Sequence, residues 1–173
     1  MSKLNEVLVI SHSVHRDKRG TFQKIYTRDT NEHLDNIEFS ESAFSTNLLK
    51  GTIRGLHFKI FPSKEWKLVT CVSGKIFDVV IDIRENSSAY GTCYTNELSH
   101  EAEISLLIPP GFAHGYQTLV DNSYVHYQLS EAHNSEFDKR LHWNDPFLRI
   151  NWPEIVSQVS DLDTKASLWP VKY

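Results

Sequence analysis

Short apolar or alternating segments recur along the middle of the chain, separated by Gly, Asn, Ser and Pro residues. A spacing of about ten residues between such segments is typical of an antiparallel β-sandwich or barrel. No full helix fits the pattern before residue 154, and residues 154–167 can form one or two short turns with Ser160 or Asp161 as a cap. We therefore predict an all-β fold with strands at residues 7–10, 22–26, 37–45, 52–58, 66–72, 76–83, 91–98, 104–108, 115–119 and 123–129.

The segment F-D-V-V-I-D-I, residues 77–83, shows the alternation most clearly. Its odd-numbered residues share one face of a strand, and Asp78, Val80 and Asp82 share the other. Ser73-Gly74 predicts a hairpin turn to the preceding strand. Edge strands near the N-terminus need a cover, which pairing with a second copy of the chain supplies economically.

Composition restricts the possible partners. A chain of 173 residues fits one domain, and its net charge of -4 without a basic run argues against nucleic acid. The first ten residues contain Glu6 within a short apolar stretch, which predicts neither a signal peptide nor a membrane span, so we expect a cytoplasmic protein. Cys71 and Cys93 lie in strand-like runs without C-x-x-C spacing, as expected for reduced core residues.

The segment G-T-I-R-G-L-H, residues 51–57, carries the first candidate for chemistry. Strict strand alternation predicts Ile53, Gly55 and His57 on one face and Arg54 and Leu56 on the other. A neutral imidazole inside a barrel can remove a carbon-bound proton. A lone histidine can equally be a core residue with its hydrogen bonds satisfied, so the interpretation depends on what else converges on it.

Other polar residues lie on separate predicted strands or at their ends. In I-P-P-G-F-A-H-G, residues 108–115, two prolines and a glycine end one strand, Phe112 anchors the return, and His114 begins the next strand. Taken one at a time, Lys67 can be an ordinary lysine exposed to solvent, and Tyr127 can be a core aromatic residue whose hydroxyl reaches water. A closed β-fold gathers such residues around one opening of the barrel. The residues concerned are His57, Lys67, His114 and Tyr127, with Arg54 near His57 in the sequence.

Four motifs together resemble a known family. These are G-T-I-R-G-L-H, W-K-L-V-T-C-V-S-G-K-I-F-D-V-V-I-D-I-R, I-P-P-G-F-A-H-G and W-N-D-P-F-L-R-I-N-W-P. They resemble the dTDP-4-dehydrorhamnose 3,5-epimerase family of deoxysugar biosynthesis, in order from about Arg19 to Asp163. The resemblance implies a single cupin-type epimerase domain over residues 1–173, folded as a jelly-roll barrel with short peripheral helices. It further implies a homodimer and no metal or redox cofactor.

The implied activity is that of an isomerase. It epimerises C3, C5 or both in a nucleotide-linked 4-keto-6-deoxyhexose by removing and returning a proton. The resemblance assigns His57 as the base, Asp163 as its paired carboxylate (Asp161 if the register slips by two), Tyr127 as the acid and Lys67 as a cation beside the enolate oxygen. It also assigns Arg19 and Arg54 to the phosphates and His114 to the binding site, and Asp138 stands where the family usually has a glutamate.

Several positions depart from the family pattern. Lys24 replaces an acidic residue, Ser42 and Lys59 replace glutamines, Ala132-His133 replaces a pair of tyrosines, and Leu162 replaces a lysine. Most of these positions contact the nucleotide or the diphosphate in the family. The identity of the nucleotide therefore stays open, as does whether C3, C5 or both are inverted.

Three other functions fit the sequence less well. A metal-dependent cupin oxygenase needs a second histidine where this chain has Lys59, and Glu65 lies too far along, so we expect no metal. A sugar 3,4-ketoisomerase typically has a histidine-rich motif that R-G-L-H-F-K lacks. A nucleotide-sugar-binding cupin without activity does not need both His57 and Tyr127, so the presence of both favours an enzyme.

Overall fold

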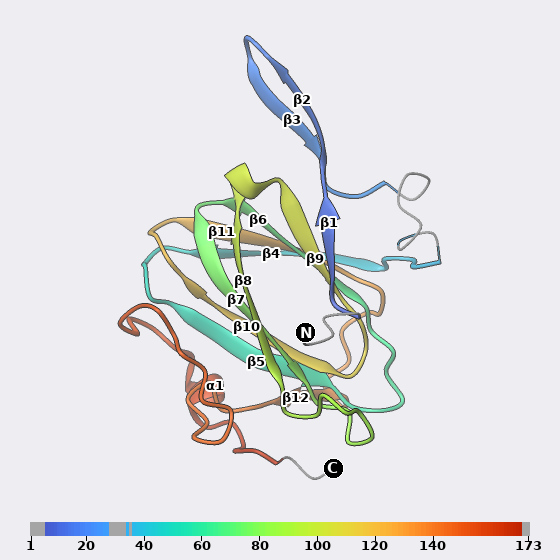
Figure 1. Cartoon of the computed structure of the whole chain (residues 1–173), viewed down its shortest axis with the longest axis vertical. Helices are drawn as coiled ribbons and strands as arrows, with labels where there is room; N and C mark the ends of the chain where they lie inside the picture. Colours follow the sequence, from blue (N-terminus) through green and yellow to red (C-terminus); the bar gives the residue numbers. More distant parts are fainter. Residues whose placement is uncertain (1–5, 28–33, 35, 171–173) are drawn as a thin grey trace.

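Two antiparallel sheets of five strands each form the body of the protein (Figure 1). The structure is a computed structural model, and it describes residues 6–27, 34 and 36–170. The first sheet has the order β1 (Leu8–Ser11), β9 (Ile104–Ile108), β6 (Lys67–Ser73), β11 (Ser123–Leu129) and β4 (Glu41–Asn47). The second has the order β12 (Asp138–Arg140), β5 (Ile53–Lys59), β10 (Phe112–Thr118), β7 (Lys75–Asp82) and β8 (Cys93–Ser99).

The main core lies between these sheets. It combines Val69, Leu106 and Val125 from the first sheet with Val80 and Leu98 from the second. The predicted all-β jelly roll is confirmed. The remaining described elements are a projecting hairpin, β2 (Ser13–Asp17) with β3 (Gly20–Lys24), and two short helices, η2 (His100–Ala102) and α1 (Asp161–Thr164). Among the described residues, no helix is long and apolar enough to cross a membrane.

The C-terminal part of the chain covers the outer face of the second sheet. The odd-numbered residues of the 77–83 segment share one face, as predicted. They belong to an outer cluster in which Leu141, Leu148 and Trp169 pack against them. Val80 points into the main core instead. This covering segment leads into α1, which begins after Ser160, one of the two predicted caps. Packing on the outer face therefore brings α1 against β5 (Figure 1).

Some predicted boundaries were wrong. Strands β2 and β12 were missed, and β10 begins at Phe112 rather than at Gly115, so His114 lies inside the strand. Ser73-Gly74 is not a hairpin turn, because β6 and β7 belong to different sheets. Gly74 has a φ of 74°, and a Cβ on it would lie 2.5 Å from the hydroxyl oxygen of Ser123. It forms a tight corner between the sheets.

An irregularity in β5 changes which side chains share a face. Arg54 is opposite Tyr116 and His57 is opposite His114, with a shift of register between the two pairs. Directly opposed residues of an antiparallel pair point to the same side, and Tyr116 points inward, because its hydroxyl bonds Ser45 of the other sheet. Arg54 therefore shares the interior face with His57, and the prediction that they lie on opposite faces was wrong.

Two glycines make this irregularity possible. Gly55 has a φ of 110°, and a Cβ built on it would lie 2.7 Å from the Cα of Gly115 and 2.7 Å from the carbonyl oxygen of His114. A Cβ on Gly115 would lie 2.7 Å from the carbonyl oxygen of Arg54. The two backbones pass too closely for any side chain, so strict alternation breaks at this point.

Candidate active site

An imidazole and a carboxylate form the centre of the candidate site. Nε2 of His57 lies 2.8 Å from Oδ1 of Asp163. The Asp163 side chain is 5% exposed, whereas that of His57 is 42% exposed. The carboxylate is therefore shielded from water, while the second ring nitrogen of His57 remains available. Asp161, the alternative partner of His57, is exposed. The carboxylate that contacts His57 is that of Asp163, the residue that the family resemblance named first.

The Asp163 carboxylate is held from several sides. Its Oδ2 accepts a hydrogen bond from the backbone N–H of Gly55 at 3.3 Å, and its own backbone N–H donates to Oγ of Ser160. Nε of Arg140 forms an ion pair with Oδ1 at 3.2 Å. Burial acts to raise the pKa of Asp163, but the hydrogen bonds from His57 and Gly55 outweigh it, so the pKa is lowered. The site thus presents an ionised carboxylate to the imidazole.

Tyr127 lies on the sheet opposite His57. Its ring packs against the main core and meets the His114 ring edge-on, at 6.5 Å between centroids. Burial raises the pKa of Tyr127 well above its ordinary value, and the neighbouring Tyr116 adds to the effect. The phenol therefore stays protonated at neutral pH, as a proton donor must.

His114 forms a second imidazole–carboxylate pair deeper in the barrel. Its Nε2 lies 2.7 Å from Oδ2 of Asp78, and both side chains are almost fully buried. Because His114 is the β10 neighbour of His57, this second pair lies next to the first. The sequence pattern predicted only that Asp78 shares a strand face with Val80 and Asp82.

Two cavities meet at His57 and Arg140. One, of about 260 Å³, is lined also by Lys59, Lys67 and Asp138. The other, of about 650 Å³, is lined also by Arg54. Nε of Arg54 donates to the side-chain oxygen of Asn47 at 2.7 Å, which fixes the guanidinium at the cavity wall. Five of the predicted residues line these two cavities: His57, Arg54, Lys67, Asp138 and Asp163. His114 lines a third pocket together with Lys67, and Tyr127 lies beside His114 on the facing sheet.

Arg19 is the predicted residue that does not join this group. It lies at the turn of the β2–β3 hairpin, which projects away from the barrel (Figure 1). Its side chain is 84% exposed and pairs with Asp17. Within a single chain, Arg19 therefore makes no contact with the cavities.

Arg140 and Glu65 belong to the site but were not predicted as site residues. Arg140 is opposite His57 in the β12–β5 pairing, and Glu65 lines the smaller cavity beside Lys67. β12 has three residues, too few for a recognisable alternation, so nothing in the local pattern points to Arg140. In the described part of the chain, no three His, Cys, Asp or Glu residues are arranged to hold a metal ion. Both cysteines are free, as predicted.

A jelly roll with a histidine–carboxylate pair at its mouth and a buried phenol on the facing sheet defines a class, the cupin-type barrels equipped for acid–base chemistry. The sequence pattern of the dTDP-4-dehydrorhamnose 3,5-epimerase family matches residues 1–170. The chain belongs to this family, and the predicted resemblance is confirmed.

Individual relatives agree with this placement. The enzyme of this name from Sinorhizobium fredii is 35% identical over 155 residues, which cover 89% of this chain and 80% of the relative. The Bacillus anthracis dTDP-4-dehydrorhamnose 3,5-epimerase, solved with TDP and PPi bound, superposes with a TM-score of 0.91 at 32% identity and covers 97% of each chain. A Legionella pneumophila dTDP-6-deoxy-D-glucose-3,5-epimerase, solved with dTDP-4-keto-L-rhamnose, superposes with a TM-score of 0.89 at 32% identity, covering 96% of this chain and 89% of that one.

Proposed function

We propose that this protein is an isomerase that epimerises C3, C5 or both in a nucleotide-linked 4-keto-6-deoxyhexose. The observation that carries the proposal is the His57–Asp163 pair at 2.8 Å, placed at the mouth of the barrel of this family. A base of this kind suits the substrate, because the 4-keto group acidifies the hydrogens on C3 and C5.

In the first step, His57 acts as the base. The ring nitrogen that does not face Asp163 takes the proton from C3 or C5, and the electrons of the broken C–H bond form an enolate with its charge on the C4 oxygen. Asp163 orients the ring and stabilises the imidazolium. Lys67 lies in the adjoining cavity wall, where its ammonium stabilises the enolate oxygen.

In the second step, Tyr127 acts as the acid. Because it lies on the sheet facing His57, its hydroxyl approaches the sugar from the other side. Its proton adds to the carbon on the face opposite the one that lost hydrogen, and the carbonyl re-forms. Solvent then reprotonates the tyrosinate and takes the proton from His57, which restores both groups. His114 and Asp138 line the sugar site in this mechanism.

The diphosphate of the nucleotide requires cations at the larger cavity. Arg54 lines it and is held by Asn47, so its guanidinium is positioned to bind phosphate oxygens. The Bacillus anthracis relative binds TDP and the Legionella relative a dTDP-linked sugar. A dTDP sugar is therefore the first substrate to test, although Lys24 and Lys59 depart from the family pattern.

The test is solvent-isotope exchange. We would incubate the protein with 4-keto-6-deoxyhexoses linked to dTDP, UDP, GDP or CDP in deuterated water and locate the deuterium by NMR. Deuterium at C3, C5 or both, with inversion, is the expected result and identifies the nucleotide as well. Binding without exchange would indicate a sugar-binding cupin, and movement of the carbonyl to C3 would indicate a ketoisomerase; either would overturn the proposal.

We further propose that the protein is a homodimer. On the outer face of the first sheet, Phe44 is 56% exposed and touches the rings of Tyr124 and His126. A second copy of the chain on this face would cover the exposed Phe44 ring. The projecting β2–β3 hairpin would then be available to the other copy, where Arg19 could bind a phosphate.

We place the enzyme in the cytoplasm. Both cysteines are free, and burial raises the pKa of each thiol to about 11. Thiols of this kind fit a reducing compartment. The net charge of -4 agrees with a small nucleotide sugar, rather than nucleic acid, as the partner.

A further inference from the structure

One carboxylate in the wall of the smaller cavity lies near two lysines. Oε2 of Glu65 is 2.6 Å from Nζ of Lys59, and its Oε1 is 3.8 Å from Nζ of Lys67. All three side chains are largely buried, with exposed fractions of 9% for Glu65, 10% for Lys59 and 18% for Lys67. The first pair is in close contact, whereas the second lies beyond hydrogen-bond distance.

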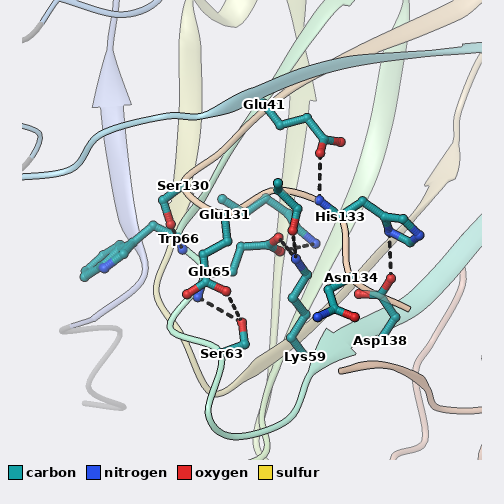
Figure 2. Close-up of polar contacts among 12 residues, drawn as sticks. Glu41, Lys59, Ser63, Glu65, Trp66, Ser130, Glu131, His133, Asn134 and Asp138 are labelled. Carbon is teal, nitrogen blue, oxygen red and sulfur yellow. Dashed lines mark hydrogen bonds and ion pairs between the residues drawn. The ribbon is translucent and has the colours of Figure 1, made fainter. Parts of the chain in front are cut away.

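The backbone around Glu65 is fixed. Its own N–H donates to Oγ of Ser63, and the N–H groups on either side of it, those of Lys64 and Trp66, donate to Glu131 and Ser130 (Figure 2). Glu65 therefore cannot move away from the two lysines as a unit. Only rotation of its side chain decides which ammonium it contacts.

Lys59 is fixed on its second side. Its ammonium also donates to the carbonyl oxygen of Ala132, at 3.3 Å. The Lys67 ammonium, in contrast, has no hydrogen-bond partner among the described residues. The three N–H donors of the Lys67 ammonium are thus left for a ligand in the cavity.

The charges around Lys67 oppose one another. Burial lowers the pKa of Lys67, Glu65 acts to raise it, Lys59 acts to lower it, and the more distant Asp138 and Asp78 act to raise it. Glu65 thus favours the charged form of the Lys67 ammonium, and Lys59 disfavours it. A direct pair with Glu65 would, however, occupy the donors that an enolate oxygen needs.

We infer that Lys59 is a positioning residue: by taking Glu65 into its own ion pair, it keeps the neighbouring carboxylate from closing on Lys67 and leaves that ammonium free for the substrate's carbonyl oxygen. The inference rests on the proposed function, and it adds two residues, Lys59 and Glu65, to those that control the reaction. It also explains how the site accommodates a lysine at position 59. The added positive charge is balanced by Glu65 and is not directed at the substrate.

Removing Lys59 alone should therefore change kcat differently from removing both Lys59 and Glu65. In Lys59→Gln, Glu65 has only Lys67 to pair with, and we expect kcat to fall by about tenfold or more with KM little changed. In the double variant Lys59→Gln/Glu65→Gln, the competing carboxylate is gone, and kcat should return to within about threefold of the wild type. If Lys59 had only a structural role, removing Glu65 as well would not restore kcat.

The matched control is an ion pair of the same type away from the cavity. Lys75 and Glu97 pair across β7 and β8, and both are exposed. Lys75→Gln and Lys75→Gln/Glu97→Gln should both keep the wild-type kcat. Should Lys59→Gln fail to fold, Lys59→Met keeps a similar length without the charge and takes its place in both variants.

Two results would overturn the inference. One is a wild-type kcat in Lys59→Gln, and the other is a double variant as impaired as Lys59→Gln alone. A crystal structure of Lys59→Gln gives a separate readout, since Glu65 should then lie within hydrogen-bond distance of Lys67. A Glu65–Lys67 distance unchanged from 3.8 Å would overturn the inference whatever the activity. Absence of exchange in the wild type would count against the proposed function instead.

Discussion

Asp163 lies 2.8 Å from His57 although the two residues are 106 positions apart in the chain. His57 is on β5 inside the barrel wall, and Asp163 is on the short helix α1 of the C-terminal segment. That segment reaches β5 by packing over the outer face of the second sheet. The His57–Asp163 pair therefore depends on this outer packing as well as on the barrel.

Removal of the His57 imidazole should abolish the reaction. In His57→Ala nothing can take the proton from C3 or C5, so we expect deuterium exchange to fall by about a thousandfold or more. The control is His100→Ala, because the His100 side chain is half exposed and pairs with Glu101. Exchange at the wild-type rate in His57→Ala would remove this residue from the mechanism.

Asp163→Asn should weaken both catalysis and stability at neutral pH. The pKa of Asp163 is lowered in the folded protein, so its stabilisation is present above the pKa of the unfolded chain, about 3.9, and is lost as the pH falls through the lower folded value. The titratable and charged groups that face it are His57 and Arg140. Urea unfolding of both proteins should show a difference in free energy at pH 7 that shrinks below about pH 4. A difference independent of pH would contradict this account.

Much of the fold could be predicted because strand periodicity is a local property. The odd-numbered residues of the 77–83 segment fall on one face in the structure as in the pattern, and strands 104–108 and 123–129 have the predicted bounds. The corner at Gly74 could not be predicted, because a tight turn within one sheet and a crossing to another use the same residues. Only long-range pairing decides between them.

The site was predictable to a smaller extent. His57 could be found from its motif, but the face that Arg54 occupies depends on the close approach of Gly55 to Gly115, 60 positions away in the chain. The role of Asp163 followed from the family resemblance and not from spacing. Arg140 is placed by the β12–β5 pairing, which no local pattern encodes.

Tyr127→Phe should separate the two proton transfers. The variant keeps the ring that packs against the core but loses the acidic hydroxyl. His57 can still remove a proton and return it to the same face, so exchange should persist while inversion falls by about a hundredfold. NMR measures the two together, and Tyr90→Phe is the control, because its ring packs at a tilt against Trp169. Equal losses of exchange and inversion would contradict an acid role for Tyr127.

Gly55→Ala should destabilise the barrel. The new Cβ would lie 2.7 Å from the backbone of Gly115, and the residue would also be held at a φ of 110°. We expect the free energy of unfolding to fall by about 3 kcal/mol. Gly20→Ala is the matched control, since Gly20 has a φ of 126° but no atom within 4 Å of the added Cβ. It should cost only about 1 to 2 kcal/mol. Equal losses in the two variants would show that the contact with Gly115 is unimportant.

Phe44→Asp should dissociate the proposed dimer. The ring is more than half exposed on β4, beside Tyr124 and His126, and burying a carboxylate there against a second copy carries a large desolvation cost. Sedimentation velocity should give a dimer for the wild type and a monomer for the variant. Because Phe44 lies on the outer face, the folded barrel should survive, as circular dichroism can check. Phe147→Asp is the control, because Phe147 is similarly exposed but packs with Trp169 over the other sheet. A dimer that persists in Phe44→Asp would place the interface elsewhere, and Arg19 would then need another route to the phosphates.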